Sequence, residues 1–333
     1  MTVRELAQLA GVSPATVSIV LNGKKGVSDK TRKSVLELAE KYEYVHTRTK
    51  SIQNDDKNIV LFLKFRKHGM LVEENQGFIS AVMDSVEERC RARNYRLSII
   101  QVDIFEKEEL EKIDFDLYVG VIVLGTEIVE NKFNILRSIP IPYVVVDNNM
   151  RNWPCNCVGI NNDENVYLAL QYFKEHGYKE IAYFSSNDQI ENFRERKKAF
   201  MEYSKKFGLE VRREFPLTPT LVGAYNDMEH FMEHKVKIPE CIFSDNDTIA
   251  IGAIKCLRKK GYKIPDDVSV IGFDDIPFAA INFPSLSTIR VPKELIGKKA
   301  VDLLFDSIED SAVRNVKIQI VGSLVIRSSV KKA

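Results

Sequence analysis

Hydrophobic and polar positions follow two different periods along this chain, and the change falls near residue 57. Before it, apolar residues recur every three to four positions, which predicts three short helices ending near residues 10, 22 and 42. After it, short apolar runs alternate with helical segments, which predicts two consecutive α/β sets, each a doubly wound parallel sheet. The expected strands are 58–65, 95–102, 117–124, 142–147, 180–185, 240–244 and 267–272, and the expected helices are 78–93, 162–176, 189–207 and 248–260. Segments 287–305 and 316–327 are expected to complete one or both sheets.

The first three helices carry strong start and stop signals. Thr2 followed by Glu5 is a capping box, in which two side chains satisfy free N–H groups of the first turn. Gly11 suits the left-handed conformation that commonly ends a helix. Ser13 is an N-cap, and Pro14 stands at the next position, where its missing N–H costs nothing.

The apolar positions of these helices are expected to form a small three-helix core, and the second helix leaves small side chains outside. The residues expected inside are Leu6, Leu9, Ala10, Val17, Val20, Leu21, Val35, Leu36 and Ala39, and those expected outside on the second helix are Ala15, Thr16, Ser18 and Ile19. Two short helices joined by a tight glycine turn form a helix-turn-helix that can enter a DNA major groove. The alternative is an ordinary helical hairpin.

The distribution of charge favours a DNA-binding helix-turn-helix over an ordinary helical hairpin. Residues 1–50 carry nine Lys and Arg against five Asp and Glu, whereas the remaining residues carry 39 against 42. A chain with a net charge of +1 therefore has a basic head and a slightly acidic body. This asymmetry suits a partner with a phosphate backbone.

Length and composition indicate several compact units in a reducing compartment. A chain of 333 residues suggests two or three units, and 44% hydrophobic residues suffice for full cores. No apolar run approaches the roughly 18 residues of a membrane span, and no signal-peptide pattern opens the chain. Five cysteines are an odd and sparse set, as in cytoplasmic proteins. We expect a cytoplasmic protein.

The run V-R-E-L-A-Q-L-A-G-V-S-P-A-T-V-S-I-V-L-N resembles the signature of the lactose-repressor (LacI/GalR-type) family of bacterial transcription regulators. Four later segments, 144–147, 177–182, 242–247 and 270–275, are similar to landmarks of the same family's core. The resemblance extends from about residue 2 to residue 327. It implies a periplasmic-binding-protein-like core of two lobes that holds a small effector between them and forms dimers.

The resemblance also assigns DNA contacts to the head. Ser13, Thr16 and Ser18 would meet phosphates or base edges, and Pro14, Ala15 and Ile19 would vary with the operator. The full candidate set is Thr2, Ser13, Pro14, Ala15, Thr16, Ser18, Ile19, Asn22, Lys24, Ser28 and Ile52. Ile19 stands where the family commonly has arginine, so a bidentate guanine contact is lost, and Ile19 could contact a thymine methyl instead.

The connection between head and core departs from the family pattern. The family usually has Y-V-P-N and then A-R-x-L here, and its leucine enters the minor groove. Residues 44–57 read Y-V-H-T-R-T-K-S-I-Q-N-D-D-K, in which Ile52 is the only apolar candidate for that role. The alternative is a plain flexible linker, in line with the polar composition.

A ligand is expected at the carboxyl ends of the core strands, because open parallel sheets bind ligands there. The expected strand ends supply Asp147, Ser185, residues 245–247 and residues 274–275. The candidate effector-binding residues, several of them taken from the resemblance, are Phe78, Asp147, Asn161, Phe193, Arg196, Asn246, Asp247 and Asp275. Carboxylates and amides suit the hydroxyl pairs of a sugar-like molecule. The competing interpretations are that Asp274 caps a turn, that Phe78 is a core residue, and that Trp153 packs on the surface rather than stacking on a ligand.

Chemical motifs other than these are weak. His230 and His234 match H-x-x-E-H, but no third ligand is evident, and Cys155 with Cys157 lacks a partner pair. We expect no metal, no cofactor and no catalytic residues.

The sequence therefore predicts a ligand-controlled regulator, most simply a repressor, that binds palindromic operator DNA as a homodimer. Its parts are a helix-turn-helix domain (1–45), an atypical hinge or linker (46–57) and a two-lobed core (58–333). Lobe 1 spans about 58–158 plus 290–320, and lobe 2 about 159–289 plus 321–333. The alternatives are a two-lobed sugar-active enzyme with an appended helical module, which predicts turnover, and a solute-binding protein, which the basic head contradicts.

Overall fold

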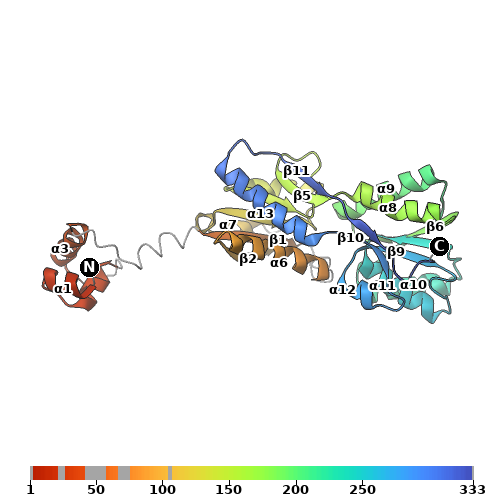
Figure 1. Ribbon diagram of the computed structural model, residues 1–333, viewed down its shortest axis with the longest axis horizontal. Helices are drawn as coiled ribbons and strands as arrows, with labels where there is room; N and C mark the ends of the chain where they lie inside the picture. The colour runs from red at the N-terminus through yellow and green to blue at the C-terminus, as the bar shows by residue number, and fades with distance from the viewer. Residues whose placement is uncertain (1–2, 22–26, 42–57, 67–75, 104–106, 332–333) are drawn as a thin grey trace. The chain divides into compact units, whose positions relative to one another are not determined.

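The computed structural model describes residues 3–21, 27–41, 58–66, 76–103 and 107–331. The chain forms two compact units, Met1–Ile59 and Val60–Ala333, called the head and the core below. The described part of the head consists of three helices, of which Figure 1 labels the first and third: α1 (Val3–Ala10), α2 (Pro14–Leu21) and α3 (Asp29–Lys41).

Local signals begin and end the head helices as the sequence predicts. Gly11 has φ +64°, and its N–H donates to the Gln8 carbonyl at 3.3 Å. The Ser13 hydroxyl accepts from the Thr16 N–H at 3.1 Å at the start of α2. Ser28 accepts from the N–H three residues later at 3.3 Å in the same way, at the start of α3. Thr2 of the expected capping box lies outside the described residues.

The head has its own apolar core, although two leucines expected inside it are exposed. The buried residues are Leu6, Ala7, Val17, Val20, Val35 and Ala39. Leu9 is 51% exposed and Leu36 is 47% exposed, so both assignments were wrong. α1 has only eight residues, and its fully buried side chains are those of Leu6 and Ala7. Ala10 is half-buried, and the side chain of Leu21 is outside the described set.

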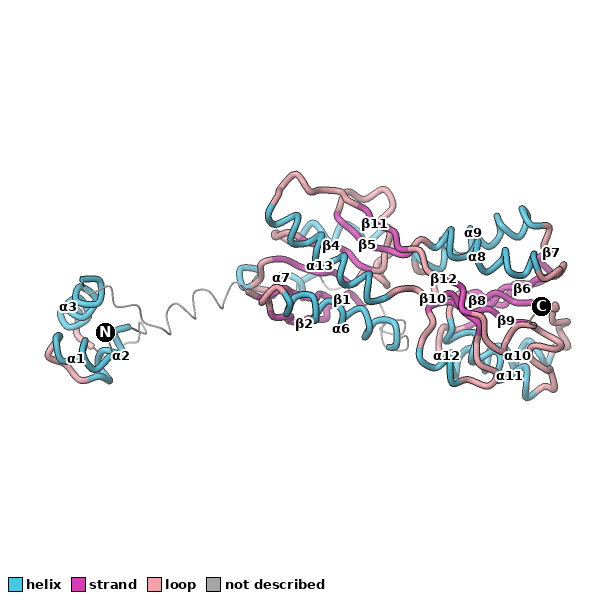
Figure 2. Tube along the Cα trace, in the orientation of Figure 1, coloured by secondary structure: helices cyan, strands magenta, loops and turns pink. Residues whose placement is uncertain are grey.

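The core contains two six-stranded sheets, which Figure 2 shows in magenta. The first has the order β11-β5-β4-β3-β1-β2 and the second the order β12-β10-β9-β8-β6-β7. The pairs with described register are parallel except β10 with β12, which is antiparallel. Sheet 1 comprises β1 (Ile59–Arg66), β2 (Arg96–Asp103), β3 (Gly120–Leu124), β4 (Tyr143–Val146), β5 (Asn156–Ile160) and β11 (Lys317–Ile320). Sheet 2 comprises β6 (Glu180–Ser186), β7 (Glu210–Leu217), β8 (Cys241–Ser244), β9 (Ser269–Asp274), β10 (Ser287–Arg290) and β12 (Ser323–Val325).

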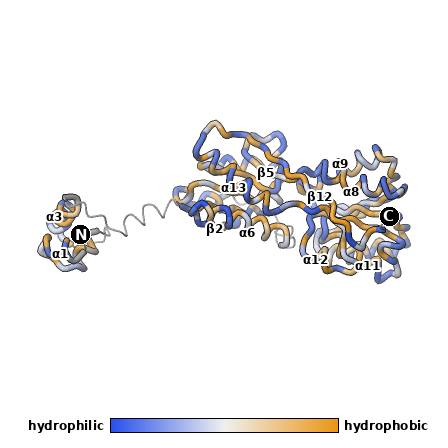
Figure 3. Tube along the Cα trace, in the orientation of Figure 1, coloured by the Kyte–Doolittle hydropathy of each residue, from blue (hydrophilic) through white to orange (hydrophobic). Residues whose placement is uncertain are grey.

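Helices cover both faces of each sheet, because the central strands are apolar on both sides. In β1, Val60 and Phe62 pack toward one layer, while Leu61 and Leu63 pack toward the other. Figure 3 shows the hydrophobic residues gathered along the strands. The helices of lobe 1 are α6 (Gln76–Ala92), α7 (Lys107–Glu111), the 3-10 segments η1 (Phe115–Leu117) and η2 (Glu130–Ser138), and α13 (Lys293–Glu309). Those of lobe 2 are α8 (Asn162–Glu175), α9 (Glu191–Phe207), α10 (Leu221–Glu233), α11 (Asp247–Lys259) and α12 (Pro277–Ile281). None of these described helices could span a bilayer.

The chain passes between the two lobes three times. It crosses from β5 to α8, from β10 to α13, and from β11 to β12. At the last crossing a Cβ on Gly322 would lie 2.4 Å from the Arg290 carbonyl oxygen, so only glycine fits there. The Gly322 N–H donates to Asn165 Oδ1 at 2.7 Å, which ties this crossing to α8.

The predicted fold class, a helical head with two parallel-sheet α/β subdomains, is confirmed. Two strands escaped the sequence pattern. β7 is an edge strand whose side chains are mostly exposed, so its sequence E-V-R-R-E-F-P-L has no apolar run. β5 is short and includes Asn156 and Gly159, although all of its residues are buried.

Candidate functional site

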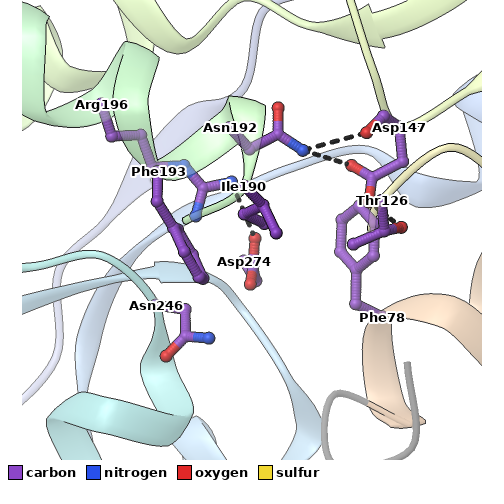
Figure 4. A pocket seen from close by; sticks show the side chains of 9 residues that line it. All are labelled: Phe78, Thr126, Asp147, Ile190, Asn192, Phe193, Arg196, Asn246 and Asp274. Carbon is purple, nitrogen blue, oxygen red and sulfur yellow. Dashed lines mark hydrogen bonds and ion pairs between the residues drawn. The ribbon is translucent and has the colours of Figure 1, made fainter. Parts of the chain in front are cut away.

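A small polar pocket lies between the two lobes of the core, at the carboxyl ends of the strands. Thr126 follows β3 and Asp147 follows β4, both from lobe 1, while Asn246 follows β8 and Asp274 ends β9 in lobe 2. The nine described lining residues, all drawn in Figure 4, are Phe78, Thr126, Asp147, Ile190, Asn192, Phe193, Arg196, Asn246 and Asp274. The topology thus converges polar side chains on one place, as parallel sheets commonly do.

Arg196 of α9 is held in place from several sides. Its side chain is 3% exposed, and Nε donates to Asn162 Oδ1 at 2.9 Å. Nη1 donates to the Asp245 carbonyl, and Nη2 lies 3.6 Å from Asp274 Oδ1. The guanidinium also stacks on Phe273, 3.6 Å from the ring centroid. These contacts fix the position of the guanidinium in the lining of the pocket.

Asp147 joins the two lobes. Its Oδ2 accepts from the Thr126 hydroxyl at 2.6 Å, and its Oδ1 accepts from Asn192 Nδ2 of α9 at 2.9 Å. Its φ of +59° is uncommon for a residue other than glycine, and such backbone conformations concentrate at functional sites. Burial is the main cause that raises the pKa of Asp147 from 3.8 to about 7, and the charge of Asp274 adds to it.

A second carboxylate, Asp245, lies directly behind the pocket. Its side chain accepts from the Tyr183 hydroxyl and from the Ser186 N–H, the latter at 2.6 Å. Burial raises the pKa of Asp245 to about 7. The site therefore concentrates buried acids whose protonation changes near neutral pH.

A further contact closes the lobes beside the pocket. Glu195 of α9 accepts from Asn149 Nδ2 at 2.6 Å, and its other oxygen lies 3.0 Å from Arg151 Nε. Both partners belong to the loop after β4 in lobe 1. These contacts hold α9 of lobe 2 against the loop after β4 of lobe 1.

The structure brings five of the eight predicted effector residues together and places three elsewhere. Phe78, Asp147, Phe193, Arg196 and Asn246 line the pocket. Asn161 instead caps α8, where its Oδ1 accepts from the Glu164 N–H at 3.0 Å.

The other two residues that lie elsewhere are aspartates. Asp247 is fully buried and accepts from the Thr288 hydroxyl at 2.6 Å and from the Ile276 N–H at 3.0 Å. Asp275 points to Arg290 and Arg327, with 2.6 Å to each. The contacts of these two residues hold the loop beside the pocket, and neither side chain lines the pocket.

Three lining residues were not predicted from the sequence, and the role of Asp274 was predicted wrongly. Thr126, Ile190 and Asn192 follow no strand-end carboxylate pattern, although the position of Asn192 one helical turn before Arg196 could have indicated it. Asp274 lines the pocket, which argues against the turn-capping interpretation. Trp153 does pack on Phe133, with ring centroids 6.0 Å apart, and does not line the pocket.

The predicted DNA-contacting residues lie on or beside the helix-turn-helix, where they are described. Ser13 and Pro14 are exposed, and Thr16 and Ile19 are half-buried on α2. Ser28 is exposed before α3. Thr2, Asn22, Lys24 and Ile52 lie outside the described residues, as do the side chains of Ala15 and Ser18.

Together, a helix-turn-helix head and a two-lobed core with a polar interlobe pocket define a class of ligand-responsive DNA-binding proteins. Comparison with known families agrees. Residues 2–46 match the model of the bacterial regulatory proteins of the lacI family, and residues 170–330 match a periplasmic binding protein-like domain.

Relatives match along nearly the whole chain. The HTH-type transcriptional repressor PurR of Vibrio parahaemolyticus is 30% identical over 344 residues, with 99% of each chain covered. PurR of Mannheimia succiniciproducens is 29% identical over 340 residues, again with 99% of each covered. The chain belongs to the lacI family of bacterial regulatory proteins, and it is a DNA-binding transcription regulator with an effector-binding core.

Solved structures share the fold. A lac repressor dimer bound to operator and the anti-inducer ONPF superposes with a TM-score of 0.76 at 19% identity, covering 100% of this chain and 99% of that one. A complex of the transcriptional regulator CelR with cellobiose gives 0.72 at 22% identity, with 99% of each chain covered.

Proposed function

We propose that this chain represses transcription by binding a palindromic operator as a homodimer, and that a small sugar-like effector in the interlobe pocket controls this binding. In this proposal residues 1–45 read the DNA, 46–57 connect, and 58–333 hold the effector. The observation that carries it is the pocket itself, because its polar lining comes from both lobes. A ligand there has different contacts in different lobe arrangements, which is the requirement for allosteric control.

The relatives support the parts of this proposal. PurR proteins are named transcriptional repressors, and the lac repressor structure contains operator DNA and a ligand in a dimer. The CelR structure contains a sugar, cellobiose. A regulator of this kind acts where the DNA is, so we propose that it works in the cytoplasm.

The homodimer has a candidate surface on lobe 2. Val222, Phe278, Ile281 and Phe283 are 70%, 57%, 76% and 75% exposed, which is unusual for large apolar side chains. They lie on both sides of α11, because the Leu221 carbonyl approaches Gly252 and Arg258 donates to the Phe283 carbonyl at 2.7 Å. On lobe 1, Ile99 of the edge strand β2 is also 50% exposed.

The dimer can be tested by sedimentation. Replacing Ile281 and Phe283 with Asp is expected to yield monomers that retain the circular dichroism of the wild type. A matched control is Ile308→Asp, since Ile308 is 37% exposed on α13 and lies outside the proposed surface. A variant that stays dimeric would move the interface elsewhere.

DNA binding can be tested by a gel shift on the promoter region next to the gene. Thr16→Ala and Ser18→Ala are expected to abolish retention, because both residues lie on α2, the proposed recognition helix. Ser34→Ala, an exposed change on α3, is the control and should not reduce binding. No retention by the wild type, or full retention by the double variant, contradicts the proposal.

We further propose that the pocket binds its ligand without transforming it. The carboxylates of Asp147 and Asp274 each contact groups that hold them in place, Thr126 and Asn192 for the first and Arg196 for the second. A ligand recovered unchanged after prolonged incubation agrees with this proposal, whereas a new product indicates an enzyme.

A further inference from the structure

The cations at the interlobe pocket are already engaged by protein oxygens. Of the nine described lining residues, Arg196 is the single cation, and its three nitrogens face Asn162, the Asp245 carbonyl and Asp274. Lys293 approaches from behind, and its Nζ donates to the carbonyls of Asp274 and Asp275. Oxygens of the protein therefore already offset part of the positive charge of both groups.

Carboxylates outnumber these cations. Asp147 and Asp274 line the pocket, and Asp245 and Asp247 lie fully buried behind it. A carboxylate oxygen has two acceptor sites, so Asp147, with one donor on one oxygen and the Asn192 side chain on the other, can accept further hydrogen bonds. Asp147 and Asp274 therefore place carboxylate acceptors in the lining of the pocket.

Aromatic faces lie beside these acceptors. Phe78 is 2% exposed and Phe193 is 6% exposed, and in the view of Figure 4 they stand on either side of Asp274. Aromatic rings attract cations through the negative charge of their faces. Asn246 adds one donor, because its Oδ1 caps α11 while its amide nitrogen has no acceptor among the described residues.

We infer that the effector of this pocket is a small ring compound bearing a protonated amine, such as an amino sugar, and that the pocket excludes carboxylated and phosphorylated analogues. The amine would lie between Asp147 and Asp274 beside the phenyl rings, and a ring oxygen or hydroxyl would accept from Asn246. This inference rests on the proposed function of the pocket and names the chemistry of its ligand.

Binding of such a ligand should be linked to proton release. The charged groups that face Asp147 are Asp274 from the end of β9 and Arg196 from α9. A bound ammonium favours the ionised form of Asp147, whose pKa of about 7 leaves much of it protonated at neutral pH. Affinity for the amine is therefore expected to rise as pH increases from 6 to 8, as long as the amine stays protonated.

The test uses the full-length chain and matched sets of ligands that differ in one group. The sets are D-glucosamine, D-glucose and D-glucuronate; D-galactosamine, D-galactose and D-galacturonate; and benzylamine, benzyl alcohol and benzoate. Thermal shift is expected to show the greatest stabilisation by the amine of at least one set and the least by its acid. Calorimetry of that amine in buffers of different ionisation enthalpy should show proton release.

Two variants distinguish the effect of the Asp147 charge on ligand binding from the effect of removing any negative charge. Asp147→Asn is expected to weaken amine binding about tenfold, the factor that corresponds to one pKa unit, and to weaken binding of the neutral analogue less than that. Glu202→Gln removes an exposed charge from the same helix as Arg196 and should change neither.

Three results would overturn the inference: greatest stabilisation by the acids, equal amine binding in wild type and Asp147→Asn, or no stabilisation by any amine. Failure of this inference differs from failure of the proposed function. A neutral or acidic compound that binds the pocket and changes operator retention would refute the amine while leaving the regulator intact.

Discussion

Asp147 should make the core less stable as pH rises, and replacing it with asparagine should remove this loss. In the unfolded chain its carboxyl has the usual pKa of 3.8, and in the folded chain the pKa is about 7. Below about pH 4 both states hold the proton, and the carboxyl costs nothing. Between these pKa values the folded state keeps a proton that the unfolded state releases, so the free energy of unfolding falls by about 1.4 kcal/mol per pH unit.

The size of the effect follows from this difference in pKa. Above pH 7 the total cost levels off at about 4 kcal/mol, and between pH 5 and pH 8 it grows by about 2 to 3 kcal/mol. Asparagine is expected to keep the local contacts, because its Oδ1 can accept from Asn192 as before. Its Nδ2 can donate to the Thr126 hydroxyl oxygen, which can act as donor or acceptor.

Urea unfolding at pH 5 and pH 8 measures this effect. Trp153 is the single tryptophan and packs in the same lobe as Asp147, so its fluorescence reports on the relevant part of the core. The Asp147→Asn variant should exceed the wild type by about 2 to 3 kcal/mol more at pH 8 than at pH 5. Asp306→Asn, an exposed change on α13, is the control for the lost charge. A gain that does not increase with pH would refute the assignment of a raised pKa to Asp147.

Three further substitutions test other parts of the structure. Gly297→Ala is expected to cost about 1 to 3 kcal/mol in urea unfolding, because the added Cβ would lie 2.8 Å from the Val82 carbonyl oxygen of α6 and push α13 away. Asp275→Asn should destabilise the core at pH 7. Although burial opposes it, hydrogen bonds with two arginines lower the pKa of Asp275, so its contribution is lost only as pH falls through that lowered value. The deficit of this variant should therefore shrink as pH falls below the usual value of 3.8, and a constant deficit would contradict the ion pairs. Ser13→Ala removes the cap of α2 and should cost the head about 1 kcal/mol, seen as faster amide exchange in that helix but not in α8.

The elements that the sequence predicted well are those with strong local signals. The turn at Gly11 and the caps at Ser13 and Ser28 depend on neighbours within four residues, so the sequence contains all the information that they need. The apolar central strands were found for a similar reason, because both of their faces are buried and their composition reflects it. Edge strand β7 carries no such signal, since its exposed side chains are polar.

The buried side chains of the head were predicted less well. The helical period shows which face of a helix is apolar, but it does not show how many residues of that face the other helices cover. Leu6 and Leu9 share one face of α1, yet Leu6 is fully buried and Leu9 is half exposed. The difference depends on where α2 and α3 cross α1, and on how much of an eight-residue helix they can cover. Tertiary contacts of this kind are not encoded in a local pattern.

The two adjacent aspartates at the end of β9 show most clearly what the sequence could not decide. Asp274 and Asp275 follow the same strand, and both have positive φ values, +103° and +51°. The ion pair with Arg196 keeps Asp274 at the pocket, whereas Arg290 and Arg327 hold Asp275 at the crossings between the lobes. These arginines come from distant parts of the chain, so no reading of the segment alone could separate the roles. One tight turn therefore joins the carboxylate that lines the pocket to the carboxylate that pairs with the arginines near the crossings.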